Sequence, residues 1–274
     1  MAVTIQEAHA FARERGTSRL VYAVVRAILM PIAKLVFRLK VTGAEYVPDE
    51  GGAIIAPNHK SMYDPFFVGL ATKRPLHYMS KDDLFDGRSG RLLLDLGAYP
   101  VIRGTADPEA LETSRIHLEA GRLLVLFPEG TRVRDPDALR APRRGAGRLA
   151  LETGVPIVPC AITGTDRLFK RGFPRKIQVS FAPAIEPAQL EATPEAAAEL
   201  IENQVWPEVE REFAKLKANP GLLAAIVAAL SAGAAGGGIA YSNQQKKKPK
   251  RKVVVRKLKL KKRGKKKSNN PFRR

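Results

Sequence analysis

The 274-residue sequence predicts an α/β layered fold, because short apolar runs typical of strands alternate with longer helical segments. The length is sufficient for one α/β domain with a full core. The charge is uneven: 17 of the 47 Lys and Arg lie within residues 246–274, which contain no acid, and the rest of the chain carries 30 bases against 27 acids. The basic character therefore belongs to a C-terminal tail, and the remainder has the balanced charge of an ordinary domain.

A basic amphipathic helix is predicted over residues 18–39, within an N-terminal region that we place at 1–40. Four bases fall within an arc of roughly 120° at helical spacing, opposite Leu, Val, Ile and Phe; they are Arg19, Arg26, Lys34 and Arg38. A membrane-spanning helix disfavours charges in its middle, so the pattern indicates a helix lying in the headgroup layer. Packing against the domain's own core is the alternative, and Pro31 can kink the helix.

The first 16 residues lack the pattern of a secretory signal, since acids and bases precede the apolar run and no small-residue cleavage site follows. We therefore expect the folded domain to stay in the cytoplasm.

The central domain, residues 41–219, contains most of the predicted strands and helices. The expected strands are 37–42, 53–57, 76–80, 99–103, 123–127, 157–162 and 177–182. The expected helices after residue 40 are 65–72, 92–96, 108–120, 144–153 and 194–216.

Composition changes at Pro220. Residues 220–245 are uncharged and rich in Gly and Ala, and Leu222–Tyr241 is just long enough to span a bilayer. If it did, the positive-inside rule would leave the folded domain outside the cytoplasm. We therefore favour a flexible or interfacial segment leading to a disordered polybasic tail, 246–274, that binds anionic lipid. Transmembrane insertion remains the alternative.

A histidine and an aspartate follow the apolar run 53–57 in the segment NHKSMYD, residues 58–64. His59 lies where a strand gives way to a loop, a usual place for catalytic side chains. A histidine held by a carboxylate such as Asp64 can act as a general base with a fixed tautomer. Alternatively, Asp64 serves only as the N-cap of a helix that begins at Pro65, and His59 is an ordinary loop residue.

A second polar segment, FPEGTR at 127–132, follows the strand-like run RLLVLF. Gly130 allows close approach of a ligand to the backbone. The guanidinium of Arg132 can hold a phosphate with paired donors. By itself this segment could equally be a turn.

In this order and spacing, the two segments resemble the motifs of the glycerophospholipid acyltransferases, in particular the 1-acylglycerol-3-phosphate type. Two further blocks of that family are present: a glycine-to-arginine block, Gly97 to Arg103, and the run Val155-Pro156-Ile157-Val158-Pro159. The segment from Arg143 to Ala146 resembles the family's basic-Gly-Ala stretch. The likeness covers about residues 18–215. The fold that it implies is a mixed β-sheet flanked by helices, with the site at strand ends.

The resemblance also implies roles for individual residues. His59 would deprotonate the acceptor hydroxyl, which attacks a thioester carbonyl, and Asp64 would orient His59. The glycerol-phosphate end of the site would consist of Arg103, Glu129, Gly130, Thr131 and Arg132. No metal, cofactor or covalent acyl-enzyme is expected. We therefore interpret Cys160 as a buried apolar residue, and His77 and His117 as structural.

The implied activity is transfer of a fatty acyl chain from acyl-CoA or acyl carrier protein to the sn-2 hydroxyl of 1-acylglycerol-3-phosphate. The product would be phosphatidic acid for phospholipid biosynthesis, made at the cytoplasmic face of the cell membrane. Another lysophospholipid or a glycolipid is an alternative acceptor. A non-enzymatic protein that binds polyanions or membranes through its tail is a second alternative. Nucleic acid is disfavoured because Phe272 is the tail's single aromatic residue.

Overall fold

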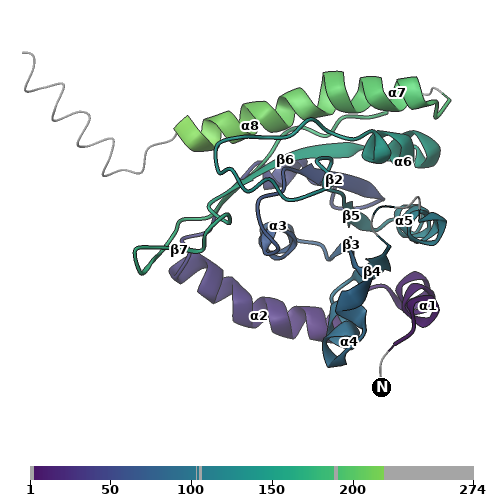
Figure 1. Ribbon diagram of the computed structural model, residues 1–274, viewed down its shortest axis with the longest axis horizontal. Helices are drawn as coiled ribbons and strands as arrows, with labels where there is room; N and C mark the ends of the chain where they lie inside the picture. The colour runs from purple at the N-terminus through teal and green to yellow at the C-terminus, as the bar shows by residue number, and fades with distance from the viewer. Residues whose placement is uncertain (1–2, 103, 105–106, 188–190, 219–274) are drawn as a thin grey trace, which may run out of the picture. The chain divides into compact units, whose positions relative to one another are not determined.

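The computed structural model describes residues 3–102, 104, 107–187 and 191–218. Its centre is a seven-stranded sheet in the order β1-β9-β6-β2-β5-β3-β4 (Figure 1). These strands are β1 (Lys40–Thr42), β2 (Ala53–Pro57), β3 (Leu76–Lys81), β4 (Ala98–Val101), β5 (Leu123–Val125), β6 (Ile157–Thr163) and β9 (Gln178–Phe181). Neighbouring strands run parallel except for β6 and β9, which are antiparallel. The sheet is therefore mixed, and each of the seven predicted strands is present.

Three strands are shorter than predicted, because residues at their ends belong to neighbouring turns or loops. The first strand begins at Lys40 rather than residue 37, since Phe37 and Leu39 still bond back to helix carbonyls and Arg38 has a positive φ of 45°. The fourth strand ends at Val101, before Arg103. The fifth ends at Val125, where the chain turns into the FPEGTR segment.

The helices are α1 (Ile5–Arg15), α2 (Arg19–Leu35), α3 (Asp64–Ala71), α4 (Arg88–Asp95), α5 (Pro108–Glu119), α6 (Gly145–Thr153), α7 (Pro194–Glu199) and α8 (Trp206–Ala218). Short 3₁₀ turns occur at Ala44–Tyr46 and Asp82–Phe85. The segment expected as one helix over 194–216 contains a π-helical turn, Leu200–Val205, between α7 and α8. Pro207 lies two residues beyond this turn, and its missing N–H disfavours a regular α-helical pattern there.

Two apolar cores lie on the two faces of the sheet, because side chains alternate along each strand. Ile55, Leu123 and Val158 belong to the core that contains residues of α2 and α3. Their neighbours Ile54, Leu124 and Ile157 belong to the core that contains residues of α5, α6 and α8. Cys160 is fully buried in the first core, as expected for an apolar residue.

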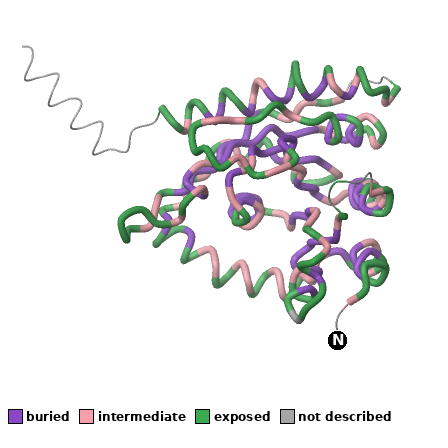
Figure 2. Tube along the Cα trace, in the orientation of Figure 1, coloured by how far each residue is buried: buried purple, intermediate pink, exposed green. Residues whose placement is uncertain are grey.

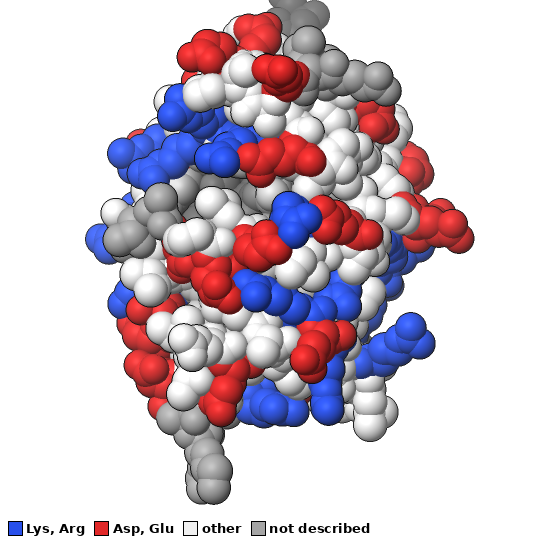
Figure 3. Space-filling model, turned by 90° about the vertical axis from the view of Figure 1, so that its right-hand side faces the viewer, with Lys and Arg blue, Asp and Glu red and all other residues white. Residues whose placement is uncertain are grey.

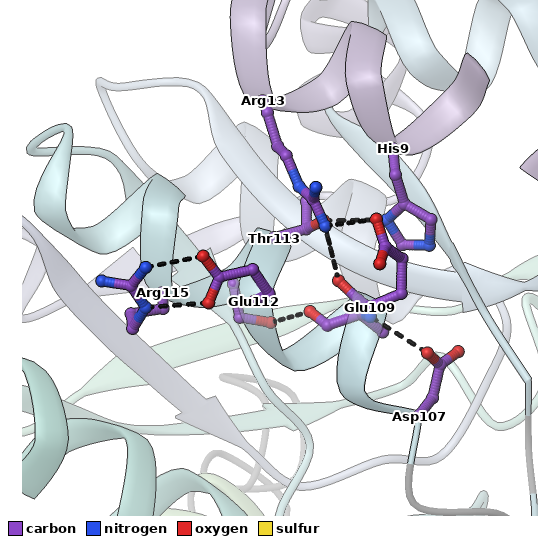
Figure 4. A network of polar contacts seen from close by, with 9 residues as sticks. His9, Arg13, Asp107, Glu109, Glu112, Thr113 and Arg115 are labelled. Carbon is purple, nitrogen blue, oxygen red and sulfur yellow. Dashed lines mark hydrogen bonds and ion pairs between the residues drawn. The ribbon is translucent and has the colours of Figure 1, made fainter. Parts of the chain in front are cut away.

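Helix α1 was not predicted, although it begins with a capping box in which Thr4 and Glu7 bond each other's backbone. It is joined to α5 by polar contacts (Figure 4). The Arg13 guanidinium donates to Glu109 Oε1 at 2.6 Å and to Thr113 Oγ1 at 2.9 Å. Buried His9 contacts the same threonine hydroxyl at 2.8 Å. The described part of the N-terminal region, residues 3–40, therefore contains two helices rather than one.

Helix α2 turns an apolar face away from the domain. Its exposed side chains include Leu20, Val24, Ile28, Ile32 and Leu35, which recur at i,i+4 and i,i+3 spacing. On its inner side, Tyr22 and Arg26 donate to the carbonyl of Gly69 in α3. Over the residues that the structure describes, no helix is both long and apolar enough to cross a membrane. The segments 220–245 and 246–274 lie outside the described residues.

Candidate active site

The candidate catalytic loop, residues 58–64, begins at the end of β2, where the side chain of Asn58 forms hydrogen bonds with the backbone of β6. The Asn58 amide donates to the carbonyl of Ile162 at 3.1 Å and accepts from the N–H of Ile162 at 2.8 Å. Asn58 is completely buried. This pair of bonds fixes the direction in which the chain leaves the sheet, and so the position of the next residue, His59.

His59 and Asp64 are in direct contact. His59 Nδ1 lies 2.9 Å from Asp64 Oδ2, which also accepts from the backbone N–H groups of Lys60 at 2.6 Å and Ser61 at 2.7 Å. Because an ionised carboxylate only accepts, Nδ1 carries the proton and Nε2 is the basic nitrogen. The Asp64 side chain is fully buried and the ring of His59 is slightly exposed. The pair has the geometry of an oriented general base.

The sequence alternative for Asp64 as an N-cap is wrong. Helix α3 begins at Asp64 itself, and the preceding Tyr63 makes no capping bond through its side chain. The carboxylate bonds backward to the loop that contains His59.

The FPEGTR segment packs directly against His59. The rings of His59 and Phe127 are stacked, the backbone N–H of His59 donates to Glu129 Oε1 at 3.1 Å, and the N–H of Val133 donates to the carbonyl of His59 at 2.8 Å. Glu129 is completely buried, and this burial raises the pKa of its carboxyl. These contacts favour a positioning role for Glu129.

Gly130 occupies a backbone conformation that other residues rarely adopt. Its φ is +68°, and a Cβ there would lie 2.7 Å from Nε of Arg143. Arg143 also donates its backbone N–H to the carbonyl of Pro128. The glycine therefore allows the basic segment at 143–146 to cross the turn closely.

A cleft of about 500 Å³ opens beside this loop. Its lining includes Ser61, Tyr63 and Thr131 together with the basic side chains of Lys60, Arg132, Arg134 and Arg167. Among the described residues, no hydrogen-bond or ion-pair partner is found for the guanidinium groups of the three arginines. The one acidic side chain of the lining, Asp166, is paired with Arg175 at 2.5 Å. An anionic group would therefore find uncompensated positive charge.

Lys60 differs from these arginines because its amine is already bound. Its Nζ donates to the carbonyls of Asp135, at 2.8 Å, and Ala138, and lies over the ring of Phe213 in α8. Burial lowers the pKa of this amine. Lys60 therefore links the candidate catalytic loop, the segment after FPEGTR and α8.

Of the predicted site residues, Thr131 and Arg132 line the cleft. The His59–Asp64 pair adjoins it, because Lys60, Ser61, Met62 and Tyr63, which lie between the two in the chain, belong to the lining. Glu129 accepts from the backbone of His59, and Gly130 lies against Arg143. Arg103 lies outside the described residues. The other end of its block, Gly97, has a φ of +91°, and a Cβ there would lie 2.4 Å from the carbonyl oxygen of Leu76. Among the described side chains, no group of three or more His, Cys, Asp or Glu residues is arranged to bind a metal ion.

The comparisons with known proteins agree with this geometry. A family model described as Acyltransferase matches residues 38–163. The 1-acyl-sn-glycerol-3-phosphate acyltransferase of Bacillus subtilis (strain 168) is 32% identical over 139 residues, which cover 49% of this chain and 68% of that protein. This chain belongs to the acyltransferase family.

A further relative and a solved structure agree. The protein of the same name from Limnanthes douglasii is 32% identical over 157 residues, covering 54% of each chain. The crystal structure of the 1-acyl-sn-glycerophosphate (LPA) acyltransferase PlsC from Thermotoga maritima superposes with a TM-score of 0.59 at 23% identity. The superposition covers 73% of this chain and 83% of the Thermotoga maritima chain. At 23% identity, the likeness shows a shared fold.

Sequence reasoning missed two residues of this acyltransferase's cleft, Arg134 and Arg167. Arg134 stands two positions after FPEGTR and could have been found by extending that motif. Arg167 comes from the segment after β6 and reaches the cleft only through the tertiary fold.

Proposed function

We propose that this acyltransferase transfers a fatty acyl chain from acyl-CoA or acyl carrier protein to the sn-2 hydroxyl of 1-acylglycerol-3-phosphate, forming phosphatidic acid. The observation that carries the proposal is the oriented His59–Asp64 pair beside a cleft lined by Arg132, Arg134 and Arg167. A base within reach of a hydroxyl, next to a site for a phosphate, suits a phosphorylated alcohol as the acceptor.

In the proposed reaction, Nε2 of His59 removes the proton of the acceptor hydroxyl as its oxygen attacks the thioester carbonyl. The tetrahedral intermediate collapses with cleavage of the C–S bond, and the proton on His59 passes to the departing thiolate. Asp64 holds the ring in the required tautomer and stabilises the imidazolium. A positioned base accounts for roughly 10²–10⁴ in rate, and alignment of the two substrates contributes further.

The phosphate of the acceptor would lie among the arginines of the cleft. Arg132 is adjacent to Thr131, which also lines the cleft. Paired guanidinium donors recognise a phosphate monoester better than a neutral headgroup, and this favours lysophosphatidic acid over uncharged lysolipids.

We place the enzyme at the cytoplasmic face of the membrane, with α2 in the headgroup layer. Its exposed Leu, Val and Ile side chains would be buried among acyl chains, and the bases on one flank would contact anionic lipid. In phospholipid biosynthesis, the enzyme would then take its acceptor directly from the bilayer.

The test is an acyl-transfer assay with purified full-length protein and a labelled acyl donor. The acceptors are 1-acylglycerol-3-phosphate, lysophosphatidylcholine, lysophosphatidylethanolamine and a lyso-glycolipid. The proposal expects the highest kcat/KM with 1-acylglycerol-3-phosphate. A higher value with a zwitterionic lysolipid or a glycolipid would assign another acceptor, and absence of transfer with every acceptor would contradict the proposed reaction.

A further inference from the structure

A short basic and aromatic hairpin projects from the domain between β6 and β9. Its strands are β7 (Phe169–Lys170) and β8 (Phe173–Pro174), paired antiparallel. The two residues between them, Arg171 and Gly172, have φ values of 52° and 82°. Positive φ at both central positions is typical of the type I′ turn that joins closely paired strands.

The side chains of the hairpin combine exposed rings with positive charge. Phe169 is 56% exposed and Phe173 is 75% exposed. Residues 167–176 contain no acid and five bases: Arg167, Lys170, Arg171, Arg175 and Lys176. Of these, Arg175 is neutralised by Asp166. Large exposed apolar side chains among cations are typical of segments that lie in a lipid interface.

The hairpin packs beside the C-terminal end of α2. Phe169 packs on Phe37, just beyond the end of α2, with ring centroids 5.8 Å apart. Arg38 donates to the carbonyl of Pro174 at 2.8 Å. Figures 1 and 2 show the hairpin beside the end of α2, with its tip coloured as exposed. The exposed apolar side chains at the end of α2, such as Leu35, and those of the hairpin, Phe169 and Phe173, therefore lie on neighbouring segments.

The base of the same hairpin reaches the candidate active site. Arg167 lines the cleft, two residues before the exposed ring of Phe169. The exposed side chains of Met62 and Tyr63 also belong to the lining of the cleft. The hairpin differs in charge from another face of the molecule. On the face drawn in Figure 3, Lys and Arg are interspersed with Asp and Glu, whereas residues 167–176 contain bases and no acid.

We propose that residues 167–176 form a second lipid-contacting element, which inserts Phe173 and Phe169 into the interface of an anionic bilayer. Lys170 and Arg171 at its tip contact lipid phosphates. Together with α2, the hairpin gives the domain two separate contacts with the surface and so fixes its orientation, with the Arg167 side of the cleft toward the headgroups. The inference rests on the proposed function in that the acceptor is taken from a membrane.

The first test places a fluorescent reporter on the hairpin of the full-length protein. Phe173→Trp is compared with Leu111→Trp, which substitutes a residue of α5 that is 40% exposed. The native Trp206 is buried and gives a constant background. Both variants are mixed with phosphatidylcholine–phosphatidylglycerol vesicles that contain acyl-chain-brominated lipid, and co-sedimentation verifies binding.

Emission from Phe173→Trp should shift to the blue and be quenched by the brominated chains, whereas emission from Leu111→Trp should be unchanged. Since co-sedimentation establishes that the protein is on the vesicle, unquenched emission from Phe173→Trp would overturn the proposal, even if other segments bind lipid.

The second test separates the hairpin from the proposed reaction. The double variant Phe169→Ser/Phe173→Ser is assayed with acceptor in vesicles and with acceptor dispersed in detergent. We expect a loss of about tenfold with vesicles, from reduced interfacial burial, and unchanged turnover in detergent. Equal activity of variant and wild type on vesicles contradicts the hairpin proposal. A loss in both formats, confined to acyl carrier protein as donor, also contradicts it and assigns the hairpin to the carrier. Wild-type inactivity in both formats contradicts the proposed function instead.

Discussion

The imidazole of His59 stacks on the ring of Phe127, with ring centroids 4.0 Å apart and planes inclined by 26°. This contact joins the two sequence motifs at the reacting side chain. The aromatic ring covers one face of the imidazole while Asp64 holds its Nδ1 edge. The proton-accepting nitrogen is therefore fixed in direction by residues from both motifs.

Replacing His59 with Gln should lower kcat by at least about 10²-fold, because the proposed mechanism assigns removal of the acceptor's proton to His59. Asp64→Asn should retain more activity, since an amide can still orient the ring but cannot stabilise an imidazolium. Steady-state kinetics of both variants measure this. Their melting temperatures serve as the control for folding, and near-normal turnover of a folded His59→Gln protein would exclude the mechanism.

Removing the side chain of Asn58 should destabilise the domain as well as the site. Asn58→Ala leaves the N–H and carbonyl of Ile162 without the partners they have now, and an unpaired buried polar group costs about 1–3 kcal/mol. Urea unfolding of wild type and variant measures the difference in free energy. Asn58→Asp is the matched control: it retains an acceptor for the Ile162 N–H but has no donor for the carbonyl. If the urea midpoint of Asn58→Ala equalled that of the wild type, the Asn58–Ile162 hydrogen bonds would not stabilise the domain.

Lys60→Met should loosen the segment that follows FPEGTR while leaving the apolar stem in place. The variant loses the donors to Asp135 and Ala138 and the cation above Phe213. Amide exchange in residues 133–140 should become faster, and kcat/KM for the acceptor should fall. Lys73→Met removes an exposed lysine elsewhere and should change neither. Unchanged exchange in Lys60→Met would show that the amine does not hold this segment.

Arg134→Gln and Arg167→Gln should each raise the acceptor KM more than they change kcat. Both guanidinium groups line the cleft, and a hydrogen bond to a charged group contributes about 1.5–3 kcal/mol, or roughly tenfold and more in affinity. Initial rates at varied acceptor and fixed donor test this. Arg148→Gln, on the exposed surface of α6, provides the control. If only the donor KM rose, these arginines would belong to the donor's phosphates.

Acid should destabilise the domain through histidines far from the reaction. His77 and His117 have ring centroids 4.2 Å apart. Burial, with a contribution from Arg122, lowers the pKa of His77 to about 4, and burial, with His77 and Arg122, lowers that of His117 to about 2. Because both values lie below the unfolded value near 6.5, the unfolded chain binds more protons below that pH, and stability falls as pH falls.

The expected slope is up to about 1.4 kcal/mol per pH unit for each histidine, beginning near pH 6.5. Urea unfolding from pH 7.5 to 4.5 measures it. His117→Asn keeps an acceptor near Arg122 but does not titrate. In this variant, the change in unfolding free energy per pH unit should be smaller by the contribution of one histidine. An identical slope in wild type and variant would show that His117 takes no part.

Several features of the fold and site could be predicted because they depend on local pattern. Each of the seven apolar runs contains a strand of the sheet. Six of these strands are buried over at least half of their length, whereas the edge strand β1 is not. The motif residues came together at strand ends, because β2 and β5 are parallel neighbours. Helix α1 was missed although Thr4 and Glu7 carry its start signal. The role of Asp64 was ambiguous because Asp before Pro is equally typical of a helix cap.

Other features could not be predicted because they depend on distant segments. The strands of the hairpin have two residues each, too short for a periodic pattern. The position of Arg167 at the cleft depends on how the chain leaves β6. The binding of Lys60 to loop carbonyls and to Phe213 depends on α8, about 150 residues later in the chain.

The edge strand β1 has consequences for the order in which this chain folds. In the sheet its neighbour is β9, so that Lys40 pairs with Gln178 and Thr42 with Ser180, 138 residues apart. During synthesis, β1 and the adjoining α2 emerge long before β9 exists, and a loop of this length must close before their edge is completed. The apolar face of α2 is therefore available to lipid while the sheet that will carry it is unfinished. A chain released before residue 178 would lack the strand that joins its first strand to the rest of the sheet.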